Sequence, residues 1–443
     1  MHPVFPAIWL STRGVWVLLA VALVIAFASV VPALVPVAAV AGATYLALLA
    51  ADVALGPGAN RIRLTRKPVG FISLRHPATL RYVVENRGAV GIRTGILESP
   101  VETFAFARDT IESDVDPHTF VEVESEFEPR ERGLVQLGSV YCWIENRLGM
   151  LRRRYRVEAP EDVRVFPDLS AIERYGKLAR RSTLLDLGLR KLRLRGLGAE
   201  FESLREYLPG DAFRSVNWKA TARRGRMMVE QYEVERSQNV LVLLDAGRLM
   251  MPRIGLQRKF DYALTAGLSV ASIAQAAGDH VGLTVFAAKP LLSVAPRRGA
   301  KHVDALTRAT YDLQPRLEEP DYETIFTQLK QRHSKRSLIV LFTDIFDPAT
   351  SAAVLAGLGT LVARHLVMCV LMNDAAIAAA LETTPSSARE AYRTSVAMSL
   401  AAEREKSIAL LRARGIIVID VPAPRLTVAL LDAYLDVKAR GLL

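Results

Sequence analysis

The middle of the chain carries a dense group of charged and aromatic residues whose types could do chemistry. Residues 205–225 read REYLPGDAFRSVNWKATARRG and include four arginines, one lysine, two acids and one tryptophan. Such side chains can transfer protons, hold phosphate groups or pair with one another. Hydrolysis needs a nucleophile, a base or a metal, and none of the seven histidines lies in this stretch. Catalysis is therefore the least favoured of the three interpretations.

Nucleic-acid binding is the second interpretation of this stretch. Its arginines and lysine would hold phosphates while Trp218 and Tyr207 stack on bases. However, the acids Glu202, Glu206 and Asp211 are interleaved with them and would repel phosphate. Nucleic acid is therefore not expected as a partner.

A structural clamp is the third interpretation and the one that we favour. Arginines and carboxylates pair in a bidentate manner, and a guanidinium can stack on the Trp218 ring. Such a clamp needs no ligand and would brace the segment that precedes the C-terminal part of the chain. The residues assigned to it are Arg205, Glu206, Tyr207, Pro209, Gly210, Asp211, Arg214, Trp218, Lys219 and Arg223.

The local structure of the clamp is predicted from its turn and cap residues. The sequence Pro-Gly-Asp at 209–211 is typical of a turn, and Asp211 is suited to cap a following helix. Gly225 fits the far end of that helix. On it, Arg214 and Trp218 lie four residues apart and would share one face.

Two aspartates further along the chain each close an apolar run. The runs are VLVLLD, which ends at Asp245, and SLIVLFTD, which ends at Asp344. Strands are expected at 240–245, 280–287, 291–296, 337–344, 365–372 and 416–422, with helix-length segments between most of them. Unbroken apolar strands indicate a mostly parallel, doubly wound sheet with both faces buried. Ligands bind at the carboxyl ends of such strands, where two carboxylates could hold Mg²⁺.

The N-terminal region is apolar enough to predict a membrane-inserted helical hairpin. No charged residue occurs between Gly14 and Ala51, and Pro32 and Pro36 divide this run. We expect two spans at about 15–31 and 35–51.

A secretory signal peptide is the competing interpretation, because Arg13 precedes the run and Ala-Phe-Ala at 26–28 resembles a cleavage site. The long apolar continuation argues against it. Positive charges flank the two spans, at Arg13 and within 61–67, and the turn between the spans has none. The positive-inside rule then predicts a multi-pass protein with both termini in the cytoplasm.

Changes in composition predict four segments along the chain. These are the hairpin at 1–60, a small antiparallel β-sandwich-like domain at 61–167, a basic connector with the clamp at 168–238, and the α/β domain at 239–443. The formal net charge is +11, and residues 152–226 hold 19 basic and 10 acidic side chains. The two cysteines, Cys142 and Cys369, are far apart and have no partner motif, which argues against a disulfide framework or a zinc site.

The clamp region also resembles a known family. Residues 196–250 resemble the signature of the domain of unknown function 58 family. The matching residues are Glu200, Phe201, Leu204 to Tyr207, Pro209 to Asp211, Arg214, Trp218, Lys219, Ala222, Arg223 and Asp245. The resemblance extends to the paired spans, the β-rich segment and the C-terminus. It implies a membrane-anchored bacterial protein with a von Willebrand factor A-like domain, associated with MoxR-type AAA+ ATPases.

The A-like resemblance bears directly on the two aspartates. A metal-ion-dependent adhesion site uses an Asp-x-Ser-x-Ser loop, a threonine and a final aspartate. Asp245 and Asp344 match the two acids, but Gly247 and Leu249 stand where the serines would be, and Thr324 is the available threonine. No cofactor is therefore expected, with Mg²⁺ at Asp245 and Asp344 as the alternative.

These observations together predict a non-enzymatic adaptor or scaffold in the bacterial inner membrane. Its cytoplasmic domain would bind a protein partner, a MoxR-type AAA+ ATPase, in the assembly or maturation of other proteins. The predicted contact surface is a rim around Asp245, Gly247 and Asp344. A metal-dependent hydrolase and an anionic-lipid or nucleic-acid binding protein are the alternatives.

Overall fold

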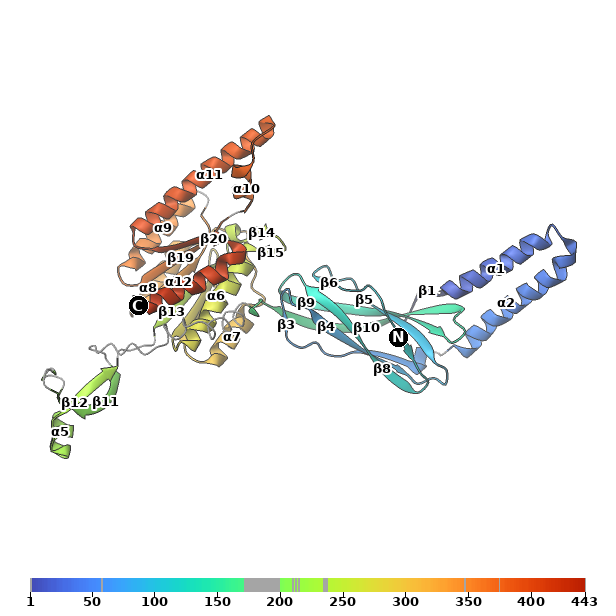
Figure 1. Ribbon diagram of the computed structural model, residues 1–443, viewed down its shortest axis with the longest axis horizontal. Coiled ribbons are helices and arrows are strands. Elements are labelled where there is room, and N and C mark those ends of the chain that lie inside the picture. Colours follow the sequence, from blue (N-terminus) through green and yellow to red (C-terminus); the bar gives the residue numbers. More distant parts are fainter. Residues whose placement is uncertain are drawn as a thin grey trace. The chain divides into compact units, whose positions relative to one another are not determined.

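The structure is a computed structural model of the 443-residue chain (Figure 1). It describes residues 2–56, 59–170, 200–208, 211, 213, 216–233, 238–345, 348–373 and 375–442. The chain divides into two compact units, Met1–Asp168 and Leu169–Leu443. The boundaries of the four predicted segments remain a prediction, and most of the predicted connector lies outside the described residues.

Two apolar helices follow the first strand of the first unit (Figure 1). They are α1 (Thr12–Ala28) and α2 (Val35–Leu55), joined through a short 3-10 turn at Pro32–Leu34. The Ser11 hydroxyl caps α1 by accepting the Gly14 N–H at 3.0 Å. The 23-residue stretch Pro32–Ala54 is long and apolar enough to cross a membrane, whereas α1 is shorter, at 17 residues.

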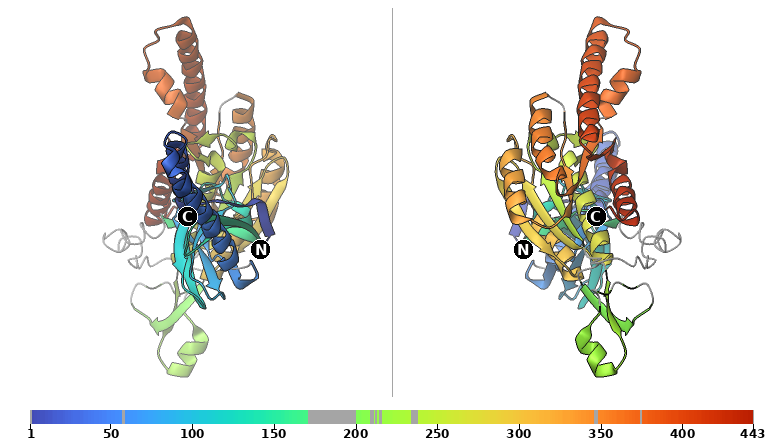
Figure 2. Two further views of the ribbon diagram at one scale, coloured as in Figure 1. Left: turned by 90° about the vertical axis from the view of Figure 1, so that its right-hand side faces the viewer. Right: turned by 90° about the vertical axis from the view of Figure 1, so that its left-hand side faces the viewer.

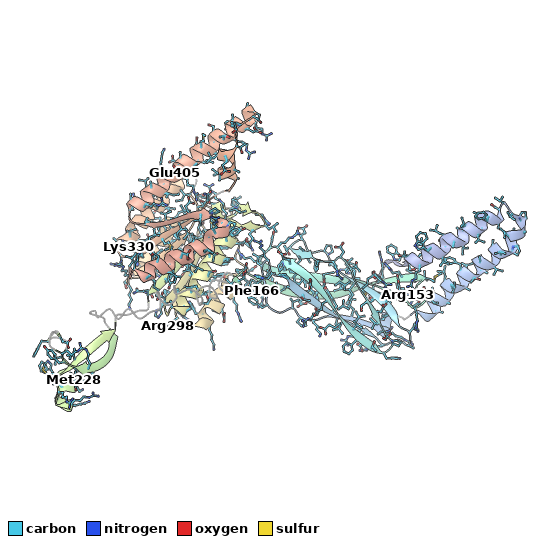
Figure 3. The ribbon with its side chains drawn as sticks, viewed as in Figure 1. Arg153, Phe166, Met228, Arg298, Lys330 and Glu405 are labelled. Carbon is cyan, nitrogen blue, oxygen red and sulfur yellow. The ribbon has the colours of Figure 1, made fainter. Side chains whose placement is uncertain are left out.

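The base of this helical hairpin is fixed to the β-strands that follow it. The buried Asp52 near the end of α2 accepts the Leu151 N–H at 2.5 Å. Its carbonyl accepts Asn146 Nδ2 at 3.0 Å, and Arg153, labelled in Figure 3, donates to the Val53 carbonyl at 2.8 Å. The apolar helices are therefore hydrogen-bonded to the β-strands and do not merely precede them in sequence.

Two sheets form the rest of the first unit. The four-stranded sheet has the order β2 (Ile62–Arg66), β4 (Ala78–Asn86), β8 (Thr119–Pro129) and β6 (Phe104–Phe106). The six-stranded sheet has the order β1 (His2–Leu10), β10 (Leu151–Phe166), β9 (Gly133–Asn146), β5 (Ile92–Glu98) and β7 (Ile111–Val115), with β3 (Ile72–Ser73) on β10. Alternate side chains of both sheets, such as Tyr82 and Cys142, share one core. The two sheets therefore pack face to face.

The second unit is built on a sheet whose strands are almost all parallel. Its order is β17 (Pro290–Arg297), β16 (His280–Phe286), β13 (Asn239–Asp245), β18 (Ser337–Phe342), β19 (Leu366–Asn373) and β20 (Ile417–Pro422). Only β17 pairs antiparallel within this described sheet. All six expected strands are present, and the mixed α/β class is confirmed.

Helices cover both faces of this sheet, as the unbroken apolar strands require. Val242 of β13 packs into a core with α6 (Lys259–Ala276), α7 (Ala300–Thr310) and α12 (Leu426–Ala439). Its neighbour Leu243 faces a second core with α8 (Tyr322–Arg332), α9 (Pro348–Val362) and α11 (Ala388–Ala413). Successive side chains of one strand therefore pack into two different cores, one on each face of the sheet.

The 26-residue helix α11 is long for this domain. Most of its buried residues, namely Ser407, Ile408 and Leu411, lie in its C-terminal half. The N-terminal half extends beyond the sheet, with α10 (Ala375–Glu382) beside it (Figure 2). Arg404 lies at the end of α11 that packs on the sheet, which brings it to the carboxyl edge described below.

The predicted clamp region forms a small hairpin of its own. Strands β11 (Glu200–Glu206) and β12 (Met228–Glu233) pair antiparallel, with helix α5 (Trp218–Arg224) between them in sequence. The predicted cap is wrong: Asn217, not Asp211, caps the helix, with its side chain accepting the Ala220 N–H at 2.8 Å. Gly225 ends the helix as expected, with φ of 65°. Pro209, Gly210 and Arg214 lie outside the described residues.

Replacing Gly95 with alanine is expected to destabilise the first unit. A Cβ at this position of β5 would overlap the indole ring of Trp143, which is buried. We expect Gly95→Ala to lower the free energy of unfolding by about 1–3 kcal/mol, because an over-packed site forces its neighbours to move. Urea denaturation of the variant and of the wild type measures this loss of stability. Gly70→Ala is the matched control, since no atom lies within 4 Å of its added Cβ, and an equal loss there would contradict the packing argument.

Candidate functional site

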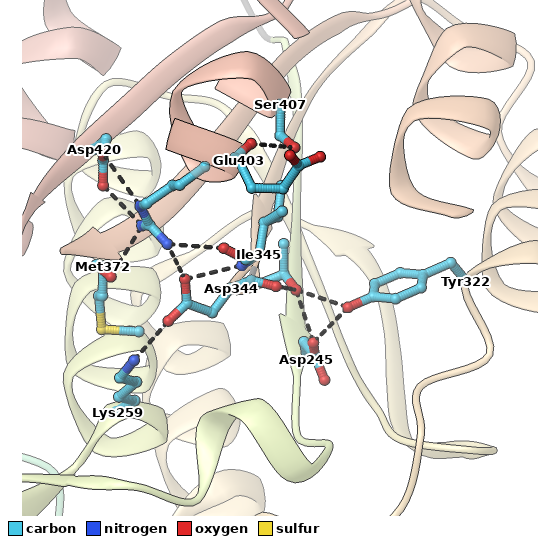
Figure 4. Close-up of polar contacts among 11 residues, drawn as sticks. Asp245, Lys259, Tyr322, Asp344, Ile345, Met372, Glu403, Ser407 and Asp420 are labelled. Carbon is cyan, nitrogen blue, oxygen red and sulfur yellow. Dashed lines mark hydrogen bonds and ion pairs between the residues drawn. The ribbon is translucent and has the colours of Figure 1, made fainter. Parts of the chain in front are cut away.

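The two predicted aspartates lie at the same edge of the α/β sheet (Figure 4). Asp245 ends β13, and Asp344 follows the adjacent parallel strand β18. Both side chains are fully buried, with 0% exposure. What they can do chemically is therefore decided by the groups that surround them.

Asp245 is surrounded by neutral hydrogen-bond donors. Its Oδ1 accepts the Gly247 N–H at 2.7 Å. Its Oδ2 lies 2.7 Å from the Tyr322 hydroxyl and 2.8 Å from the Thr343 hydroxyl. Burial raises the pKa of Asp245 to about 6, against the effect of these three hydrogen bonds, and the negative charge of Asp344 adds to the rise. No motif in the sequence pointed to Tyr322 or Thr343 as partners of Asp245.

Asp344 is paired with two cationic side chains of the same domain. Lys259, at the start of α6, donates to its Oδ2 at 2.6 Å, and its side chain is only 1% exposed. Arg404 from α11 donates to its Oδ1 at 2.6 Å, as does the Ile345 N–H at 2.9 Å. The carboxylate is thus neutralised from inside the protein.

Arg404 extends the ion-pair network to β20, the edge strand of the sheet. Its Nη2 donates to Asp420 of β20 at 2.9 Å and to the Met372 carbonyl of β19 at 3.0 Å (Figure 4). Burial opposes the charge of Arg404, but Asp344 and Asp420 outweigh it and raise the pKa of the guanidinium above its ordinary value. One side chain therefore ties α11 to three neighbouring strand ends.

The loop after β13 is covered by the segment that leads into α8. Gly247 is buried, and a Cβ there would lie 2.7 Å from Pro320 Cγ and 2.9 Å from the Glu318 carbonyl oxygen. The Arg248 N–H donates to that carbonyl at 2.9 Å, and the Arg248 side chain pairs with Glu319. A serine at position 247 would not fit without moving this segment.

The predicted rim must therefore be redefined. Asp245, Gly247 and Asp344 are all buried, so a partner cannot contact them directly. The exposed side chains at this edge include Arg248, Glu318 and Glu319, with exposures of 44, 43 and 56%. We call these three residues the outer rim.

The donor set at this edge does not fit a divalent cation. Every oxygen of Asp245 and Asp344 already accepts a hydrogen bond from the protein, and Lys259 and Arg404 supply positive charge. Thr324 is exposed, and its backbone N–H serves the cap of α8 at Asp321. Among the described residues, no group of three or more metal-binding side chains was found. We therefore assign no chemistry to a metal here.

The clamp residues behave only partly as predicted. Arg205 and Asp211 form a bidentate ion pair at 2.7 and 2.6 Å, which raises the pKa of Arg205. Glu206 pairs with Arg226 at 2.8 Å, a partner that the prediction did not include. Trp218 is 61% exposed and lies against Phe213. Arg214, which was predicted to share a face with Trp218, lies outside the described residues, so the stacking of an arginine on this ring stays a prediction.

Comparison with known proteins places this region in a family. The family described as Protein of unknown function DUF58 matches residues 203–404, which include the hairpin, Asp245, Asp344 and Arg404. Residues 203–404 belong to DUF58. The resemblance of residues 196–250 to this family is thus confirmed. The matched region contains both buried aspartates, Asp245 and Asp344.

The curated relatives that match this chain are described as uncharacterised proteins. Proteins Rv1480 of Mycobacterium tuberculosis and Mb1516 of Mycobacterium bovis are each 24% identical over 181 residues, which cover 40% of this chain. The chain spans 56% of the length of each. YeaD of Bacillus subtilis is 44% identical over 43 residues, covering 10% of this chain and 11% of YeaD. None of these names states an activity.

A solved structure was also matched. The PapD-like domain 7 of human CEP192 covers 24% of this chain and 85% of its own chain, at 11% identity and a TM-score of 0.19. The TM-score is too low to support any argument about this protein.

Removing the Lys259 charge is expected to destabilise the domain strongly. Lys259→Met would leave Asp344 buried with Arg404 as its remaining cation. Breaking a buried pair costs about 3–5 kcal/mol when the surviving charge is uncompensated, and because Arg404 remains we expect a loss near the lower end, about 3 kcal/mol. Chemical denaturation of the variant measures this loss. The double variant Lys259→Met with Asp344→Leu should recover part of it, because neither buried charge of that pair remains. A single variant as stable as wild type would contradict the assignment.

The raised pKa of Asp245 predicts a dependence of stability on pH. Because the folded-state pKa is about 6 and the unfolded value is about 3.9, the folded protein holds this proton more tightly. The contribution of Asp245 is thus favourable at low pH and is lost as the pH rises through 6. We expect the ionisation of Asp245 to lower the free energy of unfolding by about 1 kcal/mol between pH 5 and pH 8.

Asp245→Asn isolates that contribution. The neutral amide cannot ionise, so the stability of the variant relative to wild type should rise by about 1 kcal/mol between pH 5 and pH 8. Denaturation curves of both proteins at the two pH values give the difference. A difference that is constant with pH would show that Asp245 does not titrate in this range.

Proposed function

We propose that this DUF58 protein is a non-enzymatic, membrane-anchored adaptor whose A-like domain binds a protein partner, a MoxR-type AAA+ ATPase. The partner would be engaged at the carboxyl edge of the sheet, through the outer rim of Arg248, Glu318 and Glu319. The protein would act there in the assembly or maturation of other proteins. The proposal separates into a fold, a site and a location, each with its own support.

Support for a von Willebrand A-like fold comes from the strand order. Numbered along the chain, the six strands run 3-2-1-4-5-6, with an antiparallel edge strand and helices on both faces. In doubly wound sheets this order places the change of direction between strands 1 and 4. Asp245 and Asp344 stand at that point.

The observation that carries the adaptor role is the internally neutralised edge. A catalytic carboxylate or a metal ligand must present oxygen atoms to a substrate or an ion. Here the oxygens of Asp344 are used by Lys259, Arg404 and the Ile345 N–H, inside the protein. Such an arrangement holds loops in place and favours a binding surface over a reaction centre.

Support for the location comes from the N-terminal helices. Pro32–Ala54 has the length and composition of a membrane span, and the second apolar helix, α1, precedes it. We propose that both helices insert into a bacterial inner membrane, with both termini in the cytoplasm. The positive residues Arg13, Arg61 and Arg63 flank them on the proposed cytoplasmic side.

The test uses the full chain in neutral lipid nanodiscs and the purified MoxR-type ATPase of the same organism. Biolayer interferometry is run with ATP, with ADP and without nucleotide. We expect nucleotide-dependent binding that weakens about tenfold in the double variant Arg248→Ala with Glu319→Ala. The matched control is Glu323→Ala with Lys330→Ala, which removes one exposed charge of each sign from α8.

Two outcomes would contradict the proposal. Absence of binding in every nucleotide state would remove the partner. Equal weakening by the rim variant and the α8 control would remove the outer rim as the contact surface.

A further inference from the structure

The hairpin of β11, α5 and β12 presents large apolar side chains to solvent. Leu208, Phe213 and Trp218 are 55, 62 and 61% exposed. The rings form a chain of contacts, with Tyr207 to Phe213 centroids at 6.5 Å and Phe213 to Trp218 at 5.7 Å. Exposed apolar residues that cluster in this way are typical of surfaces that bind another protein or a membrane.

Three cations lie on the same short helix as Trp218. Lys219, Arg223 and Arg224 of α5 are exposed, and Lys219 and Arg223 are one helical turn apart. Within the described part of the chain, no acidic side chain pairs with any of the three. Their positive charge is thus available to an anionic partner.

Two acids of the hairpin, Asp211 and Glu206, are already paired with arginines. Asp211 is held by Arg205, and Glu206 by Arg226. In the sequence these acids argued against an anionic ligand, because they interleave with the basic residues. In the structure their charge is compensated locally, so that objection to an anionic partner no longer holds for them.

We propose that this surface binds an anionic lipid bilayer. It consists of Leu208, Phe213, Trp218, Lys219, Arg223 and Arg224, and we call it the α5 patch. Aromatic and aliphatic side chains beside Lys and Arg are typical of segments that lie in the bilayer interface, where cations meet lipid phosphates. Nucleic acid fits less well, because Leu208 offers no ring for base stacking.

The inference is independent of the adaptor role and of the N-terminal helices. It concerns the hairpin alone and holds whether or not an ATPase binds the outer rim. Its test therefore measures lipid directly and involves no protein partner.

The experiment measures binding of the full chain, held in phosphatidylcholine nanodiscs, to added vesicles. One set of vesicles contains roughly a third phosphatidylglycerol and the other is pure phosphatidylcholine. Co-sedimentation should show binding to the anionic vesicles alone, and the affinity should fall as the salt concentration rises. The variant Lys219→Glu, Arg223→Glu, Arg224→Glu should bind at least about tenfold more weakly.

Control variants separate charge, apolar contact and misfolding. Lys301→Glu, Arg308→Glu, Arg332→Glu makes the same change of charge at exposed positions elsewhere and should bind like wild type. Leu208→Ser with Phe213→Ser keeps the three cations and should also lose affinity. Circular dichroism and the Tm verify that each variant is folded, and the milder Lys219→Gln, Arg223→Gln, Arg224→Gln serves if the reversal fails to fold.

Two results would overturn the inference. The first is that the protein does not bind anionic vesicles, or that the patch variant and its charge-matched control lose this binding equally. The other is binding of single-stranded DNA that the patch variant abolishes while vesicles fail to bind, which would assign the α5 patch to nucleic acid.

Discussion

The carboxyl edge of the α/β sheet depends on one buried carboxylate and the two cations that neutralise it. Asp344 is fully buried, with Lys259 on one oxygen and Arg404 on the other. A buried carboxylate without a cation would be ionised at a large cost in free energy or would hold a proton. The three residues therefore have to be brought together for the domain to fold as it does, and they come from α6, α11 and the end of β18.

This ion-pair network is the basis on which we propose the edge as a binding surface. Arg404 also reaches Asp420 and the Met372 carbonyl, so the ends of β18, β19 and β20 are connected through one guanidinium. Asp245 lies beside the network but is held by hydroxyl and backbone donors, with no cation among the groups that shift its pKa. The edge thus combines a fixed, neutralised interior with an outer rim of exposed charges.

The sheet could be predicted because its strands are unusually clear in sequence. Runs such as Val240–Asp245 are apolar at every position except the last, and that pattern indicates burial on both faces. The same argument placed Asp245 and Asp344 at a common edge. Their partners could not be predicted in this way, because Lys259 and Arg404 lie 85 and 60 residues from Asp344 in the sequence. A lysine at a helix start and an arginine within a charged helix look like ordinary surface residues until the fold brings them to a buried acid.

The hairpin shows the limits of local motif reasoning. Asp211 and Asn217 are both good cap residues, and the sequence alone favoured the one beside the turn, whereas Asn217 makes the capping hydrogen bond. Asp211 instead pairs with Arg205 and accepts the Leu208 N–H. The neutralisation of Asp344 by Lys259 and Arg404, which occupies both of its oxygens, is tested most directly by electron paramagnetic resonance of Mn²⁺ added to the full chain. The account predicts no Mn²⁺ bound at this edge at millimolar concentration; stoichiometric binding that Asp344→Asn abolishes in a folded protein would contradict it.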